Sequence, residues 1–128
     1  MLVSRVAAVA LTLSLLVLQP ASATTCVNKF LAHSEGYKVV VTLLSGKLSF
    51  QEAQELSRQH GLVEWLDDSG KVVATCAELR ALRPMPVGCD GKTSGVVMMA
   101  TFLTMRHPSK KMIVKLGAVG AVDFDEQS

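Results

Sequence analysis

The residues in this chain best suited to chemistry are three cysteines, Cys26, Cys76 and Cys89. In an exported protein, which the N-terminus argued below indicates, cysteines form disulfides more often than metal sites. The segment between Cys76 and Cys89 contains two prolines and a glycine and shows no clear strand pattern. We therefore expect a Cys76 to Cys89 disulfide that pins this segment as a loop, worth about 3 kcal/mol in the chain-entropy model. Bridges from Cys26 to Cys76 or to Cys89 stay open as alternatives.

The three histidines do not form a recognisable site. His33, His60 and His107 lie far apart in the sequence, and none has a second metal-ligand type at helical spacing. The pattern therefore indicates neither a metal site nor a cofactor. A Cys-His nucleophilic pair that leaves the loop disulfide intact would join Cys26 to His33 or His107. His33 and His107 are explained more simply as solvated loop residues, and His60 as a last-turn residue that favours a helix C-terminus.

The carboxylates and glycines also lack catalytic spacing. Asp67 and Asp68 fall in a turn, and residues 123–126 read as an exposed acidic tail. Gly91 and Gly95 precede an expected strand rather than a helix, so they do not form a phosphate-binding loop. No catalytic residue is predicted.

Two segments could instead form a binding surface. The first is the basic tip, residues 106–111, which concentrates positive charge in Arg106, His107, Lys110 and Lys111. A charged turn containing proline would also keep a hydrophobic hairpin soluble and stop it from pairing edge to edge, and this structural explanation is favoured.

The second segment is the expected loop over residues 77–95. Its larger apolar side chains are those of Leu79, Leu82, Met85 and Val87. A loop stiffened by proline and closed by a disulfide loses little entropy on docking, so it suits recognition of a partner. Covering one end of the core would explain the same apolar residues equally well.

The N-terminus determines where these residues would work. Arg5 supplies a positive n-region, and residues 6–18 run for thirteen positions without a charge. That run is typical of a signal peptide and shorter than the roughly 20 residues of a membrane-spanning helix. Small residues follow at Ala21 and Ala23, the two positions that signal peptidase reads. We therefore expect a cleavable signal peptide over 1–23 and cleavage before Thr24.

Removing residues 1–23 leaves residues 24–128 as a single secreted or periplasmic domain without a stable membrane span. Arg5 is the only charged residue of the leader, so the mature chain carries 12 basic and 11 acidic side chains, a net charge of +1. This balance gives no indication of nucleic-acid binding. A domain of this length buries a modest core, so a stabilising crosslink would be useful.

The first expected elements are a strand and a helix. Residues 37–44 are rich in β-branched side chains and are bounded by turn residues, which predicts a buried strand. Ser49 is a good helix N-cap, and Glu52 lies three residues later to complete a capping box. Gly61 is placed where a left-handed residue would end that helix. The helix is expected to pack on one face of a sheet.

The remaining strands are expected as two hairpins. Residues 62–66 and 71–76 flank the sequence Asp-Asp-Ser-Gly at 67–70, which favours a turn. Residues 96–105 and 112–124 form the second predicted hairpin, joined by the basic tip. The predicted fold is thus α+β: one small, disulfide-stabilised domain with a largely antiparallel sheet of about five strands and one helix packed on it.

These observations favour an exported protein that acts by binding another protein, as a secreted effector, an inhibitor or a periplasmic accessory factor. Two alternatives stay open, and both depend on Cys26. A small secreted enzyme or toxin would use Cys26 as a free thiol, and a structural or assembly subunit would be linked through it, as in a dimer.

Overall fold

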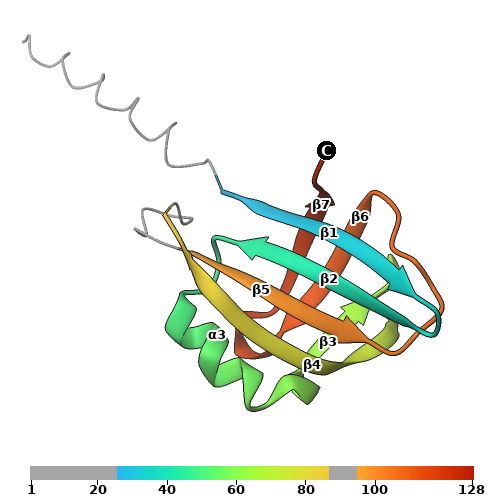
Figure 1. Cartoon of the computed structure of the whole chain (residues 1–128), viewed down its shortest axis with the longest axis horizontal. Coiled ribbons are helices and arrows are strands. Elements are labelled where there is room, and N and C mark those ends of the chain that lie inside the picture. Colours follow the sequence, from blue (N-terminus) through green and yellow to red (C-terminus); the bar gives the residue numbers. More distant parts are fainter. Residues whose placement is uncertain (1–25, 87–94) are drawn as a thin grey trace, which may run out of the picture.

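The computed structural model describes residues 26–86 and 95–128, and their backbone forms a closed barrel of seven strands (Figure 1). Around the barrel the strands follow the order β1-β2-β5-β4-β3-β6-β7. The strands are β1 (Asn28–Glu35), β2 (Lys38–Ser45), β3 (Val63–Leu66), β4 (Val72–Met85), β5 (Gly95–Phe102), β6 (Lys111–Leu116) and β7 (Ala121–Glu126). The helices are α3 (Phe50–Ser57) and the short 3-10 turns η1 (His60–Leu62) and η2 (Gly117–Val119).

The predicted α+β fold with an open sheet of about five strands is therefore wrong. All neighbouring strands run antiparallel except β1 and β7, which pair in parallel and close the barrel. Side chains alternate between the two faces of a strand, so a closed sheet buries every second side chain in its own interior. This alternation is regular in β2, where Val39, Val41 and Leu43 are fully buried.

The hairpin of β1 and β2 was half predicted. The strand expected over 37–44 is confirmed as β2, which begins one residue later. β1 was not predicted, because only Phe30 among its eight residues is fully buried and most of the others are polar. The two strands pair along their whole length and are joined by a turn of Gly36 and Tyr37, in which Gly36 has a φ of 67°.

The start of helix α3 is confirmed in detail. The backbone N–H of Glu52 donates to Oγ of Ser49, and the backbone N–H of Ser49 donates to Oε1 of Glu52, which is the predicted capping box. The predicted end is wrong. Arg58 caps the helix, and Gly61 lies in η1 without a positive φ. The helix buries Ala53 against the core.

The first predicted hairpin is confirmed as β3 and β4, but β4 continues far beyond its expected end. Its first part pairs with β3, and residues from Cys76 to Met85 pair with β5. Register shifts between Cys76 and Glu78 and between Ala81 and Arg83 mark bulges. Such bulges bend a strand and interrupt its alternation of buried and exposed residues. The loop predicted from residue 77 is therefore a strand up to Met85.

The second predicted hairpin is wrong. β5 pairs with β2 and β4, whereas β6 pairs with β3 and β7, so residues 103–110 cross from one side of the barrel to the other. The expected return strand over 112–124 is two strands separated by η2, where Gly117 and Gly120 have φ values of 54° and 93°. Those conformations are readily available to glycine, and they reverse the chain.

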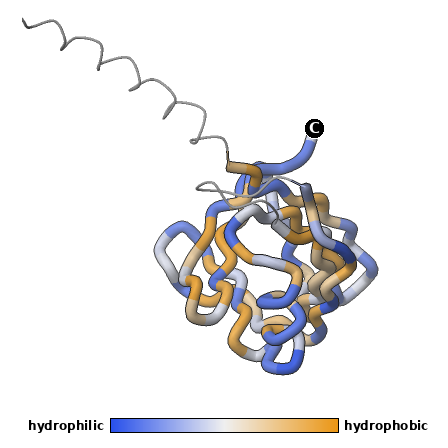
Figure 2. The backbone as a smooth tube through the Cα atoms, turned by 90° about the vertical axis from the view of Figure 1, so that its left-hand side faces the viewer, coloured by the Kyte–Doolittle hydropathy of each residue, from blue (hydrophilic) through white to orange (hydrophobic). Residues whose placement is uncertain are grey.

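The connections gather at two opposite ends of the barrel. We name the turn end after residues 36–37, 67–70 and 103–110, which lie on the right in Figure 1. We name the helix end after α3, η1 and η2, on the left. Figure 2 shows hydrophobic segments along the barrel wall and hydrophilic segments at many connections and at the C-terminus.

The predicted disulfide from Cys76 to Cys89 is wrong, because Cys76 is a free thiol buried in the core. Its Sγ donates a hydrogen bond to the backbone oxygen of Glu78 at 3.0 Å.

Several predictions fall on residues outside the described ranges. Cys89 and Val87 are among these residues, and so are residues 1–25. The expected signal peptide and its cleavage site therefore stay predictions. Within 26–86 and 95–128, no helix is long and apolar enough to span a membrane.

Candidate functional site

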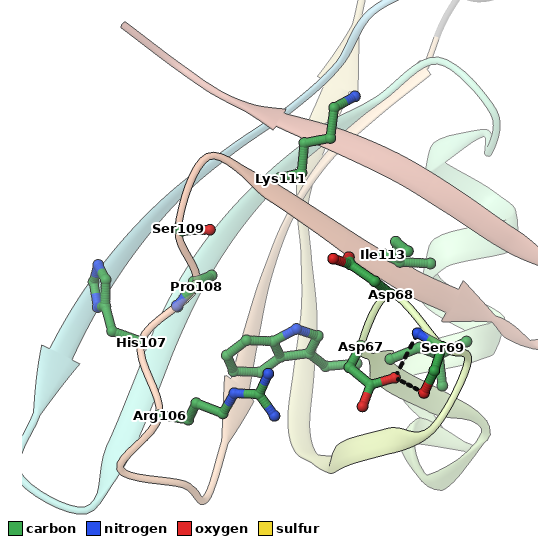
Figure 3. A pocket seen from close by; sticks show the side chains of 11 residues that line it. Asp67, Asp68, Ser69, Arg106, His107, Pro108, Ser109, Lys111 and Ile113 are labelled. Atoms are coloured by element: carbon green, nitrogen blue, oxygen red, sulfur yellow. Dashed lines mark hydrogen bonds between the residues drawn. The ribbon is translucent and has the colours of Figure 1, made fainter.

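An open polar crevice lies at the turn end, between the β3–β4 turn and the connection from β5 to β6 (Figure 3). Its volume is about 390 Å³. The lining comprises two aspartates, two serines, three basic side chains and four apolar residues: Asp67, Asp68, Ser69, Ser109, Arg106, His107, Lys111, Trp65, Leu66, Pro108 and Ile113. Both signs of charge thus meet in a hollow whose wall includes the nearly buried indole of Trp65.

The aspartate side of the crevice is fixed by a tight turn. Oδ1 of Asp67 accepts hydrogen bonds from the hydroxyl and the backbone N–H of Ser69, at 2.7 and 2.9 Å, and from the backbone N–H of Lys71 at 2.9 Å. These bonds favour the charged carboxylate, so the Ser69 hydroxyl first and then the Lys71 N–H lower the pKa of Asp67. The β3–β4 turn therefore favours the negatively charged form of the Asp67 carboxylate at the crevice.

The connection on the other side is anchored at three points. The backbone N–H of Arg106 donates to Oγ1 of Thr104 at 3.0 Å, and Pro108 is buried. Nδ1 of His107 lies 2.6 Å from Oγ of Ser34, which ties the connection to β1. Figure 3 shows Arg106 extending toward Asp67, and its positive charge contributes to the lowered pKa of that carboxyl. The eight-residue connection from β5 to β6 thus holds the guanidinium of Arg106 opposite the carboxylate of Asp67.

The cations of the crevice differ in how they are used. Nζ of Lys111 lies 3.1 Å from Oδ1 of Asp125 on β7, and this carboxylate raises the pKa of Lys111. Lys111 is therefore already neutralised in part by its neighbour. Within the described part of the chain, Arg106 has no ion pair shorter than 4 Å. Its guanidinium is the cation best placed to meet a carboxylate from outside.

Large apolar side chains stand exposed beside the crevice. Tyr37 is 73 % exposed, Leu103 60 % and Met105 83 %. Strand register explains their proximity, since Val39 pairs with Phe102 and the 36–37 turn therefore lies next to residues 103–105. We call Tyr37, Leu103 and Met105 the apolar rim.

The structure brings together most of the predicted basic tip. Arg106, His107 and Lys111 line the same crevice, whereas Lys110 is exposed but does not line it. The basic tip was predicted to be the turn of a hairpin. It is instead part of the connection that crosses from β5 to β6. Its sequence pattern could not reveal the aspartates opposite, because the β3–β4 turn is about 40 positions away in the chain.

The predicted apolar binding residues of the 77–95 segment do not lie together with the basic tip. Leu79 is 4 % exposed and belongs to the core, so it offers no surface contact. Leu82 and Met85 are half-buried on β4, away from the crevice. Val87 falls outside the described residues. The structure therefore does not join this segment and the basic tip into one surface.

The described cysteines and histidines do not form a nucleophilic pair with one another. Cys26 is not a free group, and its Sγ accepts a hydrogen bond from Nδ2 of Asn28 at 3.3 Å. Nε2 of His33 lies 3.5 Å from Oε2 of Glu35, and Nδ1 of His60 lies 3.0 Å from the backbone oxygen of Cys76.

The pair formed by Ser34 and His107 was missed by the sequence analysis, because the two residues are 73 positions apart. A serine beside an imidazole is the beginning of a nucleophilic site. In the part of the chain that the structure describes, no carboxylate is within ion-pair distance of His107 to orient its ring, and both side chains are exposed. The contact serves to hold the connection against β1.

A second hollow, of about 290 Å³, lies at the helix end between α3 and η2. It is lined mainly by leucines and small residues, including Leu56, Leu62 and Leu116, with Glu52 and Glu55 on the helix side. Over residues 26–86 and 95–128, no three side chains of His, Cys, Asp or Glu are grouped so that they could hold a metal ion.

Comparison of the chain with protein-family models, with curated proteins and with solved structures gives no match.

Proposed function

We propose that this protein acts by binding another protein, as an exported module, secreted or periplasmic, that contacts its partner through the turn end. The observation that carries the proposal is the apolar rim. Tyr37, Leu103 and Met105 are each more than half exposed and come from two connections that the barrel places side by side. Aromatic residues and methionine are enriched at protein interfaces. A group of exposed apolar side chains on a protein surface is typical of an interaction site.

The crevice next to the rim supplies the polar part of such an interface. Arg106 can meet a carboxylate of the partner, and the Asp67 carboxylate can meet a cation, so the surface selects a partner of complementary charge. The connection is anchored through Thr104, Pro108 and His107, so little of it has to be ordered on binding.

Site-specific photo-crosslinking in the cells that make the protein tests the proposal. A photoreactive amino acid at position 105 should give a covalent adduct with one partner protein. The matched control is position 62, since Leu62 is 51 % exposed but lies at the helix end. Adducts from position 62 and none from position 105 would show that the turn end is not the interface.

Substitutions extend the test to function. Met105→Asp should abolish the biological effect of the protein while leaving its unfolding transition unchanged, because Met105 contributes almost nothing to the core. Leu62→Asp, also at an exposed apolar position, should leave the effect intact. The opposite pattern in two folded variants would overturn the proposal.

A further inference from the structure

The outer surface of four neighbouring strands, β1, β2, β5 and β4, forms one continuous face across the front of the barrel in Figure 1. Val41, Met98 and Leu79 belong to the core, so the residues on either side of each of them point outward. The strand registers align these outward residues in three rows. From β1 to β4, the rows are Lys29, Leu44, Val97 and Arg83; Leu31, Thr42, Met99 and Arg80; and His33, Val40, Thr101 and Glu78.

The first two rows share one arrangement, with uncharged side chains in the middle and cations at the flanks. Lys29 stands on the β1 flank, and Arg80 and Arg83 stand on the β4 flank. The middle positions, on β2 and β5, are occupied by Thr42, Leu44, Val97 and Met99. We call these two rows, from the Lys29 row to the Leu31 row, the basic face. It contains three cations and no carboxylate.

The basic face is partly open to solvent. Its three cations are exposed, and Leu31 is 54 % exposed. Leu44 and Met99 are half-buried, whereas Val97 is buried without belonging to the core. A partner that covered Leu31, Leu44 and Met99 would remove their apolar surface from water, which favours association.

The cations of the basic face have no ion-pair partner among the described residues. In the part of the chain that the structure describes, no carboxylate oxygen lies within 4 Å of the charged nitrogens of Lys29, Arg80 or Arg83. Asp125, the register partner of Lys29 on β7, is paired instead with Lys111 at 3.1 Å. The three positive charges are therefore available to carboxylates of another molecule.

The composition of the basic face indicates the class of its partner. An apolar centre within a charged rim, with arginine prominent, is typical of surfaces that bind protein. A second copy of the chain is a poor occupant, because two basic faces packed directly against each other would bring six cations together without a carboxylate.

Nucleic acid and lipid fit the basic face less well than protein. Its two rows contain no aromatic side chain on which the base of a single strand could stack. Binding to an anionic lipid surface usually takes a cluster of about four to eight cations, whereas the basic face has three cations divided between two flanks.

We propose that the basic face is a second interaction surface, which binds a protein that presents an apolar strip between carboxylates. The apolar strip covers Leu31, Leu44 and Met99, and the carboxylates pair with the cations on both flanks. The basic face shares no residue with the crevice or the apolar rim, so the inference goes beyond the proposed function. The barrel thus contacts other proteins along its side as well as at its turn end.

Photo-crosslinking in the cells that make the protein identifies the partner. A photoreactive amino acid at position 31 should give a covalent adduct with one other protein, which is then purified for binding measurements on the full chain. Position 62 at the helix end is the matched control, since Leu31 and Leu62 are 54 % and 51 % exposed. The absence of a protein adduct at position 31, or the same adduct in equal yield at position 62, would overturn the inference.

Charge reversal on the β4 flank then tests the complementarity of charge. Arg80→Glu and Arg83→Glu should each weaken the affinity for the purified partner by about tenfold, whereas Lys115→Glu, at an exposed cation on β6, should change it by less than about twofold. Raising NaCl from about 50 to about 500 mM should weaken binding of the unmodified protein by about tenfold, a result that does not depend on how the variants fold.

Either of two results in these measurements would contradict the inference. One is an affinity that does not change with salt. The other is a folded Arg83→Glu variant that binds the partner as tightly as the unmodified protein does.

Other outcomes would assign the basic face to a different occupant. An adduct at position 31 with twice the mass of the chain would show a second copy there. Sedimentation of the protein with phosphatidylglycerol vesicles, if Arg83→Glu abolished it, would show a lipid surface. Each of these results would overturn a site for a foreign protein.

The two crosslinking positions also separate this inference from the proposed function. An adduct from position 105 without one from position 31 would overturn the basic face as a binding surface and leave the proposed function standing. An adduct from position 31 without one from position 105 would overturn the turn end as an interface and leave the basic face standing.

Discussion

The helix end and the turn end of the barrel differ in how closely their residues are packed. At the helix end, Leu48 is 2 % exposed, and the backbone at Gly95 approaches the strand end at Ser45 so closely that an added Cβ would lie 2.3 Å from its oxygen. At the turn end the chain leaves an open polar crevice and exposes Tyr37 and Met105. The close contacts around Leu48 and Gly95 therefore stabilise the fold, whereas Tyr37 and Met105 contribute little to the core and remain available for contact with a partner.

A matched pair of leucine truncations tests this division most strongly. Leu48→Ala should lower the free energy of unfolding by about 2 to 5 kcal/mol, because it leaves a cavity in the core. Leu103→Ala, at a position that is 60 % exposed in the turn end, should change it by less than about 0.5 kcal/mol. Urea denaturation measures both values. Equal losses would mean that the two ends share the stability.

Glycine substitutions should give the next largest effect. Gly95→Ala should cost about 1 to 3 kcal/mol, since the new methyl group meets backbone atoms of Ser45 and Gly46 that cannot move aside cheaply. Gly61→Ala is the control, because nothing lies within 4 Å of its added Cβ. Thermal unfolding of the two variants should separate them clearly. A tolerated Gly95→Ala would show that the helix end is less tightly closed than described.

The buried thiol gives a smaller effect, on reactivity. Burial raises the pKa of Cys76, so the reactive thiolate is scarce near neutral pH. Alkylation of Cys76 by iodoacetamide at pH 8 should be slow in the folded protein and fast in denaturant, as followed by peptide mapping. Rapid labelling under native conditions would indicate that the strand around Cys76 opens readily.

The smallest effect is expected at the β3–β4 turn. Hydrogen bonds lower the pKa of Asp67 in the folded state, so its contribution to stability is complete above the pKa of an unfolded aspartate, about 4. That contribution should fade as the pH falls through the lower, folded value. Asp67→Asn should flatten the acid side of the plot of melting temperature against pH. An unchanged acid slope would argue against a structural charge at the crevice.

Local features of this fold were predictable because their signals are local. The capping box of Ser49 and Glu52 and the turn at 67–70 follow from residues within a few positions of each other. The buried run of β2 was equally clear. In each case one short stretch of sequence contains both partners of the interaction that fixes the structure.

Closure of the barrel could not be predicted in this way. In β4 the buried residues Cys76 and Leu79 are three positions apart because a bulge intervenes, so the strand lost the alternation by which strands are recognised. Pro84 strengthened the expectation of a loop, although it occupies the last part of a strand. The polar residues of β1 concealed a strand whose only fully buried side chain is Phe30.

The candidate site was predictable only in part for the same reason. The charges of Arg106 and Lys111 were visible as a cluster, but the crevice depends on Asp67 from a distant turn. The contact between Ser34 and His107 joins residues 73 positions apart, and no sequence pattern in either segment predicts it. Sequence reasoning found the charged residues and missed the surface that they share.

The pairing of Lys29 with Asp125 also sets an order of events in folding. These residues lie near the start of the first strand and near the end of the last strand, so their contact carries a high loop-closure cost, which slows its formation. The β1–β2 hairpin can form as soon as residue 45 is available, while β1 must wait for β7. Until residue 126 is in place, the side of β1 that pairs with β7 is an unpaired strand edge, a surface that makes partly folded chains prone to aggregate.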